Sequence, residues 1–358
     1  MSLKILQRNG WEELVLTLRP EADETPEGIL MRAISLLHRE NAELLRAVVF
    51  GRVAHNAEPP RRPRGVPVTF VEGAPCNADA VAGAQVTGAR GGRLTFYEAG
   101  NGGMVSVVED GHARWAWITG IEPTQLWAPP HIQAREAFER AEAALRLAAM
   151  DFRHVYRTWL FLDNILGWYG ELNRVRTEFY RERGVLQGLV PASTGIGASN
   201  PSHSALVLDL LAVAPSDDSV SVVALPSPLQ CPALDYGSSF SRAVEVREPG
   251  LRRIFVSGTA SIGADGRTRH VDDILAQTEY TIEVVEAILN SRGMDWGHAN
   301  RGLVYVRDAG DAAEVASCLA RRGVPSELIV TTQSIVCRQD LLFEIEVDAA
   351  ASSDLGQP

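Results

Sequence analysis

Met150-Asp151-Phe152-Arg153-His154-Val155-Tyr156-Arg157 returns later in the chain as Met294-Asp295-Trp296-Gly297-His298-Ala299-Asn300-Arg301. The offset is 294 − 150 = 144 residues, and Met, Asp, an aromatic residue, His and Arg keep their places in both copies. Self-similarity at a fixed offset is typical of duplicated structural units, so this repeat decides the architecture before any single element is considered. It also allows the copies to be compared position by position.

The bulk composition is ordinary for a soluble globular protein of two or three domains. Of the 358 residues, 46% are hydrophobic and 22% are charged. No apolar run approaches the ~18 residues that span a membrane, and residues 1–4 do not begin a signal peptide, so we expect a cytoplasmic protein without a membrane partner. The net charge of −11 predicts no nucleic-acid partner. The cysteines lie far apart without a C-x-x-C pair, which argues against a zinc site or a disulfide framework.

The third unit, residues 226–350, has the clearest pattern. It predicts two helices, at 272–290 with Asp272-Asp273 as the cap and at 311–322 with a stop at Gly323. Strands are predicted at 253–257 and 303–306, and two closing strands at 328–336 and 341–347. The order is therefore β-α-β-α-β-β.

The second unit, residues 111–225, repeats this order. It predicts strands at 114–119, 158–162 and 205–213 and helices at 132–149 and 171–183. Alignment of Asp209 with Glu344 gives an offset of 344 − 209 = 135 residues. The difference from the first offset, 144 − 135 = 9, predicts nine extra residues near 164–170.

The first unit, residues 1–110, is degenerate. Strands are predicted at 14–18, 47–50, 67–70 and 80–86 and a helix at 26–45. The Pro- and Arg-rich stretch 59–65 takes the place of the second helix. Residues 88–110 and 215–238 are predicted to be linkers, and residues 351–358 a disordered tail.

Several motifs resemble the Rid family, the reactive-intermediate deaminases that are also called the endoribonuclease L-PSP family. They are residues 237–244 (GSSFSRAV), 255–258 (FVSG), 276–278 (AQT) and 343–346 (FEIE) in the third unit, and 172–180 in the second. Rid proteins are trimers of a small sheet with helices on one face and sites between subunits. The resemblance therefore implies an α+β pseudo-trimer in which one chain supplies three Rid-like units.

The segment 337–346 is similar to the closing motif of chorismatases, which are multi-unit members of this superfamily. Residues 191–197, 239–243 and 256–261 are also similar, and Tyr169, Leu172, Asn173 and Arg176 fit the chorismatase helix pattern Y-x-x-F-[NC]-x-x-R with Leu in place of Phe. One departure follows Trp159, where chorismatases have Asn and Tyr and this chain has Leu160-Phe161. The resemblance is therefore firmer for the architecture than for the substrate.

Glu344 is the candidate catalytic residue. On an extended strand, Glu344 and Glu346 share one face while Phe343, Ile345 and Val347 share the other, which should pack beneath the helices. In the alignment above, the other units have Gly83 and Asp209 at the position of Glu344. A carboxylic acid in a partly dry cleft acquires a raised pKa and can donate a proton near neutral pH. A solvated acidic strand edge is the alternative.

The resemblance also implies a set of substrate-binding residues. The guanidinium group of arginine can bind a carboxylate through two parallel hydrogen bonds, and phenyl rings can line a pocket. The candidates are Arg242, Arg338, Arg176, Asn173, Phe240, Gly258, Thr259 and Cys337. In chorismatases that release hydroxybenzoate the family pattern places a Cys at the position of Cys337, although a buried, inert cysteine is equally consistent. The residues shared by both octapeptides, His154, His298, Arg157 and Arg301, are predicted to be structural.

These features favour a chorismatase-like enzyme, a lyase or hydrolase. Resemblance implies that it cleaves the enolpyruvyl ether of chorismate or a related small carboxylic acid, with Glu344 as the acid and with no metal or other cofactor. A Rid-type imine or enamine deaminase is one rival, although Thr69, Ser193 and Ile329 stand where those enzymes place an Arg. A non-catalytic protein that binds a small metabolite is the other. The molecule is expected to be a monomeric pseudo-trimer or a homo-oligomer.

Overall fold

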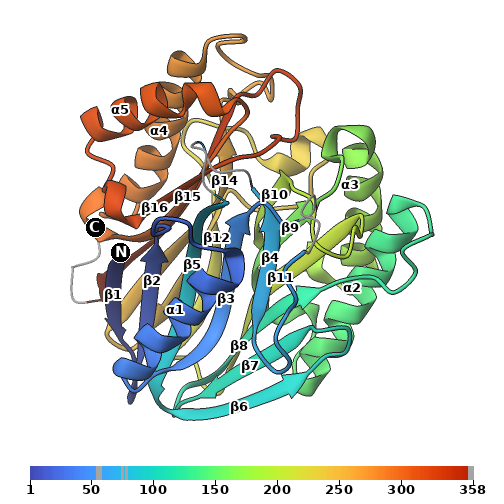
Figure 1. Ribbon diagram of the computed structural model, residues 1–358, viewed down its shortest axis with the longest axis vertical. Helices are drawn as coiled ribbons and strands as arrows, with labels where there is room; N and C mark the ends of the chain where they lie inside the picture. Colours follow the sequence, from blue (N-terminus) through green and yellow to red (C-terminus); the bar gives the residue numbers. More distant parts are fainter. Residues whose placement is uncertain (54–58, 74–75, 77–79, 354–358) are drawn as a thin grey trace.

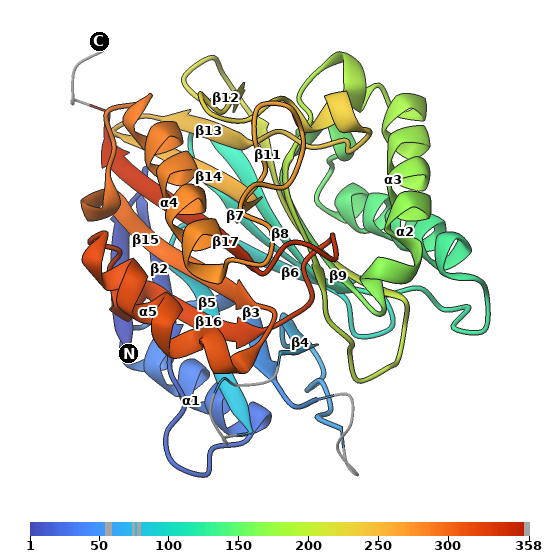
Figure 2. The same cartoon turned by 90° about the horizontal axis from the view of Figure 1, so that it is seen from above.

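Three β-sheets form the centre of the molecule, and the helices lie on the outside (Figures 1 and 2). The computed structural model describes residues 1–53, 59–73, 76 and 80–353. Each sheet belongs to one unit, so the α+β fold of three units in one chain is confirmed.

The first unit has a five-stranded sheet in the order β1-β2-β5-β3-β4, covered by one helix. Its elements are β1 (Ser2–Gln7), β2 (Trp11–Leu18), α1 (Pro26–Arg39), β3 (Glu43–Gly51), β4 (Val68–Glu72) and β5 (Val81–Gly91). Residues 59–67 contain no helix, as the Pro- and Arg-rich stretch predicted. Helix α1 ends earlier than the predicted 45, because Asn41 turns left-handed (φ 54°) and the Ala42 N–H bonds back to the Leu37 carbonyl oxygen.

The second unit has a six-stranded sheet in the order β10-β9-β11-β8-β7-β6. Its elements are β6 (Arg93–Glu98), β7 (Met104–Glu109), β8 (Ala113–Ile121), α2 (Pro130–Leu147), β9 (Val155–Leu162), α3 (Ile165–Glu182), β10 (Ala192–Gly197) and β11 (Leu206–Pro215).

The third unit has a six-stranded sheet in the order β12-β13-β14-β17-β15-β16. Its elements are β12 (Ser221–Leu225), β13 (Ala243–Glu248), β14 (Leu251–Ala260), α4 (Ile274–Asn290), β15 (Ala299–Val306), α5 (Ala312–Arg321), β16 (Ile329–Gln333) and β17 (Phe343–Ser352). Short 3₁₀ turns complete the fold: η1 (Phe152–His154), η2 (Val185–Gln187), η3 (Ala233–Tyr236), η4 (Trp296–His298), η5 (Ala309–Asp311) and η6 (Ser326–Leu328).

The predicted linkers were wrong. Strands β6 and β7 lie within 88–110 and pair with β8, so the second sheet begins at Arg93 rather than after residue 110. Strand β12 lies within 215–238 and pairs with β13 of the third unit. The predicted tail was wrong for its first residues, because β17 continues through Ser352; residues 354–358 lie outside the described residues.

The repeated octapeptide forms the same local structure twice. Asp151 accepts a hydrogen bond from the Arg153 N–H, while its own N–H donates to His154 Nδ1 at 3.1 Å. Asp295 and His298 repeat this capping box, with an N–H to Nδ1 distance of 3.2 Å. The prediction that both histidines are structural is therefore confirmed.

Strand pairing corrects the alignment of the units. Asp209 pairs with Trp159, and Glu346 pairs with Leu303, which stands 144 residues after Trp159. Asp209 is therefore the counterpart of Glu346, and Val207 that of Glu344. The offset is 346 − 209 = 137, which leaves 144 − 137 = 7 extra residues instead of nine. They lengthen α3, which has 18 residues against 10 in α5.

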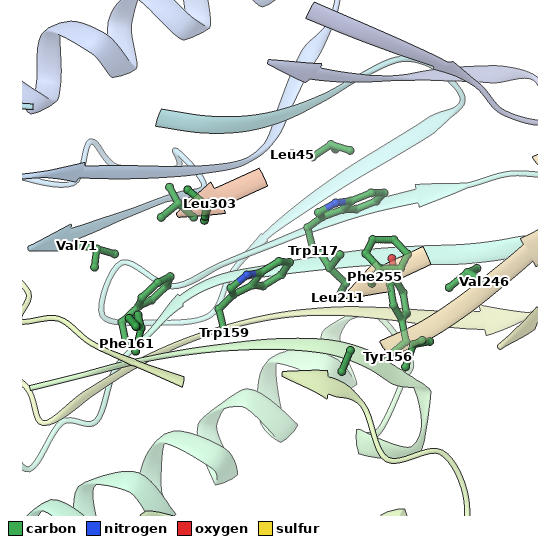
Figure 3. Close-up of a cluster of buried hydrophobic side chains, with 14 of the residues drawn as sticks. Leu45, Val71, Trp117, Tyr156, Trp159, Phe161, Leu211, Val246, Phe255 and Leu303 are labelled. Atoms are coloured by element: carbon green, nitrogen blue, oxygen red, sulfur yellow. The ribbon is translucent and has the colours of Figure 1, made fainter. Parts of the chain in front are cut away.

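Equivalent residues of the three units meet in a central core (Figure 3). Phe50, Phe161 and Tyr305 occupy equivalent positions; the ring centroids of Phe50 and Phe161 are 6.1 Å apart, and those of Phe50 and Tyr305 6.2 Å. Each sheet buries its other face beneath its helices, as predicted for Phe343, Ile345 and Val347.

Candidate active site

A cavity lies between the second and third units. Its empty volume is about 730 Å³, counting the open mouth. The second unit contributes residues of α3 and β10, and the third unit contributes residues of β14, β17 and the segments before β13 and β17.

The structure brings eight of the nine predicted site residues together around this cavity: Asn173, Arg176, Phe240, Arg242, Gly258, Cys337, Arg338 and Glu344. Thr259 is the exception. Its side chain is buried, and its hydroxyl donates to the Ser257 carbonyl oxygen at 2.8 Å. Thr259 pairs with Ile345, whose side chain packs beneath the helices, so the Thr259 side chain points away from the cavity.

Glu344 is an acid held without a partner. Its side chain is only 4% exposed, and no hydrogen bond or ion pair joins its carboxyl to another residue in the described part of the chain. Burial, with a further contribution from the negative charge of Glu346, raises the pKa of Glu344 to about 8, against an opposing effect of Arg157. At neutral pH the group is therefore mostly a neutral carboxylic acid that faces a cavity.

Gly258 makes room for this acid. A β-carbon at position 258 would lie 2.1 Å from Glu344 Oε1 and 3.0 Å from its carboxyl carbon. The Gly258 N–H donates to Thr194 Oγ1 across the unit boundary at 3.0 Å. The glycine thus permits the close approach of β14 to the Glu344 carboxyl.

Three arginines in the cavity have no acidic partner among the described residues. Arg176 donates to Asn173 Oδ1 at 2.6 Å and lies near Ser193 Oγ at 3.4 Å. Arg242 donates to the Cys231 carbonyl oxygen at 3.0 Å, and Arg338 to the Gly266 carbonyl oxygen at 2.9 Å. Uncompensated positive charge in a buried cavity favours an anionic ligand, and several guanidinium groups favour more than one carboxylate.

Aromatic rings separate these cations. The Arg242 guanidinium lies 5.4 Å from the ring centroid of Tyr236 and 5.6 Å from that of Phe240, and Arg338 lies 5.1 Å from Tyr236. Sequence reasoning did not place Tyr169, Tyr236, Ser193 or Ser238 in the site, although all four line the cavity. Tyr169 was visible as the first residue of the chorismatase helix pattern, and Tyr236 immediately precedes the Gly237 motif.

Cys337 lines the cavity as a thiol. Burial, and then the neighbouring Glu344, raise the pKa of Cys337 to about 12. A thiol with so high a pKa is a poor nucleophile, so its position favours a packing role against the ligand.

The arginine position of the deaminases is occupied by other residues. Ser193 pairs with Thr158, and Ile329 pairs with Gly302. Gly302 stands 144 residues after Thr158, so Ser193 and Ile329 are equivalent, as predicted. The register places Val68 at this position of the first unit, where Thr69 had been predicted. None of the three residues is cationic. Among the described residues there is also no group of three or more His, Cys, Asp or Glu that could hold a metal ion.

No protein-family model matches the chain. A 3-hydroxybenzoate synthase from Streptomyces hygroscopicus is 29% identical over 247 residues, which are 61% of this chain and 70% of that protein. A chorismatase from Streptomyces rapamycinicus is 27% identical over 225 residues, 56% of this chain and 65% of that protein. The crystal structure of a chorismatase at 1.08 Å resolution covers 97% of this chain and all of the other, with a TM-score of 0.67 and 18% identity. The chain has the chorismatase fold. The resemblance seen in the motifs is thereby confirmed.

Only one of the three unit boundaries in this chorismatase fold carries an acid at the Glu344 position. Between the first and second units the equivalent residue is Val207, and Arg62 donates to the carbonyl oxygen of Gly120, the counterpart of Gly258, at 2.8 Å. Between the third and first units the equivalent is Gly83, where a β-carbon would lie 2.9 Å from the Val330 methyl groups. The cavity at Glu344 is therefore the candidate active site.

No helix in the described residues is both long and apolar enough to cross a membrane.

Proposed function

We propose that this protein cleaves the enolpyruvyl ether of chorismate, or of a closely related small dicarboxylic acid, and releases pyruvate, with Glu344 as the general acid. The observation that carries the proposal is the neutral Glu344 carboxyl in a cavity with three arginines that lack acidic partners. The names of the relatives, chorismatase and 3-hydroxybenzoate synthase, support the same class of substrate.

The chemistry needs a single strong proton donor. Glu344 would protonate the terminal methylene of the enol ether, which becomes the methyl group of pyruvate and leaves an oxocarbenium ion next to the Glu344 carboxylate. Attack of water on that ion gives a hemiketal, which collapses to pyruvate and a ring alcohol. Alternatively, a neighbouring ring hydroxyl attacks the ion, and elimination gives pyruvate and a hydroxybenzoate without net consumption of water. The arginines would hold the substrate carboxylates, so that the methylene faces Glu344.

The position of Cys337 favours the hydroxybenzoate outcome. Its neutral thiol lies on the cavity wall beside Glu344 and would border the ring. A dihydroxylated cyclohexadiene acid is the other product, and the two are distinguished by whether the ring becomes aromatic.

Incubation of the protein with chorismate in D₂O tests the proposal. We expect pyruvate whose methyl group carries one solvent deuteron, and an aromatic or a diene product in the NMR spectrum. Glu344→Gln should reduce turnover by at least about a hundredfold, because an amide cannot donate a proton of comparable acidity. Glu314→Gln, on the exposed face of α5, is the matched control and should be silent.

Absence of pyruvate above the uncatalysed background would refute the proposal. The deaminase and the non-catalytic alternatives would then be separated by ammonia release from freshly generated 2-imino acids.

A further inference from the structure

Two carboxyl groups share one face of β17 but have opposite surroundings. Glu346 is two residues from Glu344 and fully buried. Arg157 Nη2 donates to Glu346 Oε2 at 2.7 Å, and Trp159 Nε1 lies 2.8 Å and 2.9 Å from its two oxygens. The Thr194 hydroxyl and the Arg301 guanidinium donate to the same carboxylate. Glu344 receives none of these donors.

The donors come from both sides of the unit boundary. Arg157 and Trp159 lie on β9, Thr194 on β10 and Arg301 on β15. Thr194 also accepts the Gly258 N–H, so a single hydroxyl connects Glu346 to the glycine that lies against the Glu344 carboxyl. The arrangement fixes a negative charge at Glu346 and prevents Arg157 from turning to Glu344.

We propose that Glu346 is a positioning residue for Glu344: its anchored carboxylate occupies the donors of this wall and keeps the neighbouring carboxyl in its neutral, proton-donating form. That the Glu344 proton is used in catalysis rests on the proposed function. Burial is the larger cause of the raised pKa of Glu344, and Glu346 adds to it although Glu346 is absent from the cavity wall.

The other groups that face Glu344 do not supply this negative charge. They are Arg157 on β9, Tyr305 on β15, Tyr169 and Arg176 on α3, Cys337 and Arg338 before β17, and Tyr236 and Arg242 before β13. Burial raises the pKa of the tyrosines and of Cys337, so these groups are uncharged near neutral pH. The arginines favour an ionised Glu344. Burial would raise the pKa of Glu346 itself, but Arg157 and Arg301 outweigh that effect and hold the pKa low.

The chain contains a matched control. Asp209, the counterpart of Glu346, accepts hydrogen bonds from Arg46 at 3.0 Å, from the Thr69 hydroxyl at 2.7 Å and from the Gly120 N–H at 2.7 Å. It is also fully buried, but its neighbour at the Glu344 position is Val207. A change at Asp209 should therefore disturb a similar ionic cluster whose own neighbour, Val207, cannot ionise.

The test is the titration of Glu344 in Glu346→Gln. Infrared spectra of Glu346→Gln are recorded without substrate over a range of pH, and the spectra of the double variant Glu344→Gln/Glu346→Gln are subtracted. The difference reports the protonation of the Glu344 carboxyl alone. We expect the midpoint to fall by at least about two pH units, since Arg157 and Arg301 then favour the Glu344 anion. In the pH profile of turnover, the decline on the alkaline side should shift to lower pH by the same amount. Activity should therefore fall more than about tenfold at pH 8 but stay within a few-fold of the wild type at pH 5. Asp209→Asn should lower the melting temperature and leave both midpoints in place.

Two results would overturn the inference: a Glu344 midpoint that stays within about half a unit in Glu346→Gln, or a loss of turnover that is equal at every pH. If Glu346→Gln does not fold, Arg157→Met provides a test of opposite sign, because removal of the cation should raise the midpoint; an unchanged or lowered midpoint there counts against the inference. The titration needs no turnover. If the wild-type protein releases no pyruvate, the proposed function fails while the role of Glu346 is still decided.

Discussion

The Glu344 carboxyl binds its proton more tightly in the folded chain than in the unfolded one. Its pKa is about 8 when folded, against an ordinary value of 4.5. The stability that comes from the bound proton is therefore fully present below about pH 4.5 and is lost as the pH rises through about 8.

Glu344→Gln should remove this dependence. The variant should match the wild type below about pH 4.5 and exceed it progressively at higher pH, by up to roughly 4 kcal/mol in the free energy of unfolding at pH 8. Urea unfolding at several pH values measures the difference. A constant difference across the range would contradict a protonated Glu344.

Gly258→Ala should displace the acid from its position. The new β-carbon would meet Glu344 Oε1 at 2.1 Å, so the carboxyl must move and turnover should fall by at least about tenfold. Gly195→Ala in the same cavity is the control, because its β-carbon would meet nothing closer than 3.6 Å, at Tyr169. Equal kinetics for Gly258→Ala and the wild type would show that the position of Glu344 is not critical.

Cys337 should resist alkylation. A thiol with a pKa of about 12 supplies very little thiolate near pH 8. Peptide mass spectrometry after iodoacetamide treatment should find Cys337 unmodified in the native protein and modified after denaturation. Rapid native labelling would indicate a reactive cysteine and reopen a nucleophilic role.

The segment between β16 and β17 is held to helix α4 by one side chain. Gln277 is fully buried; it donates to the Asp340 carbonyl oxygen at 2.8 Å and accepts from the Leu342 N–H at 2.8 Å. This segment carries Cys337 and Arg338 into the cavity, so its order controls two residues of the site.

Gln277→Ala should loosen that segment. The variant loses three partly buried hydrogen bonds, because Gln277 also donates to the His270 carbonyl oxygen. This loss should cost about 2 to 4 kcal/mol of stability and raise the KM more than it lowers kcat. Hydrogen exchange should increase at Leu342 but not in β9 of the second unit. Unchanged exchange at Leu342 would argue against this anchoring role.

Local patterns predicted α4, α5 and the strands β14 to β17 of the third unit, because their ends are marked, but they missed β12 and β13. Asp273 caps α4 through the Ala276 N–H, and Gly323 follows α5 in a left-handed conformation. Strand β6 was missed because it is an exposed edge strand, and its largely solvated residues lack the apolar pattern of a buried strand. Strand β7 is buried and has an apolar sequence, so its signal was present and was overlooked. The turn between them, with positive φ at Asn101 and Gly102, was an available hairpin signal.

The candidate site was predictable only in part, for a related reason. Strand alternation predicted that Glu344 and Glu346 share a face, and the motifs predicted most of the cavity wall. The difference between the two carboxyls depends on Arg157, Trp159 and Thr194, which lie about 150 to 190 residues away in sequence. The pattern of a single strand cannot reveal which of two neighbouring acids receives donors from another unit.

Because one chain supplies both sides of the cavity, the site should not depend on subunit association. Specific activity should stay constant on dilution over about a thousandfold range of protein concentration. Steady-state assays from micromolar to nanomolar enzyme measure this. A fall in activity that follows a change in sedimentation would instead show that a further assembly completes the site.

The covalent trimer also changes what a mutation can do. In an assembly of three identical subunits, every substitution is copied into all three interfaces, so a change that improves one site must be tolerated in the other two. Here Gly83, Val207 and Glu344 occupy equivalent positions but are encoded separately. Two interfaces are thus free to be selected for adhesion between units, while the third can keep a buried acid that weakens the fold as the pH rises.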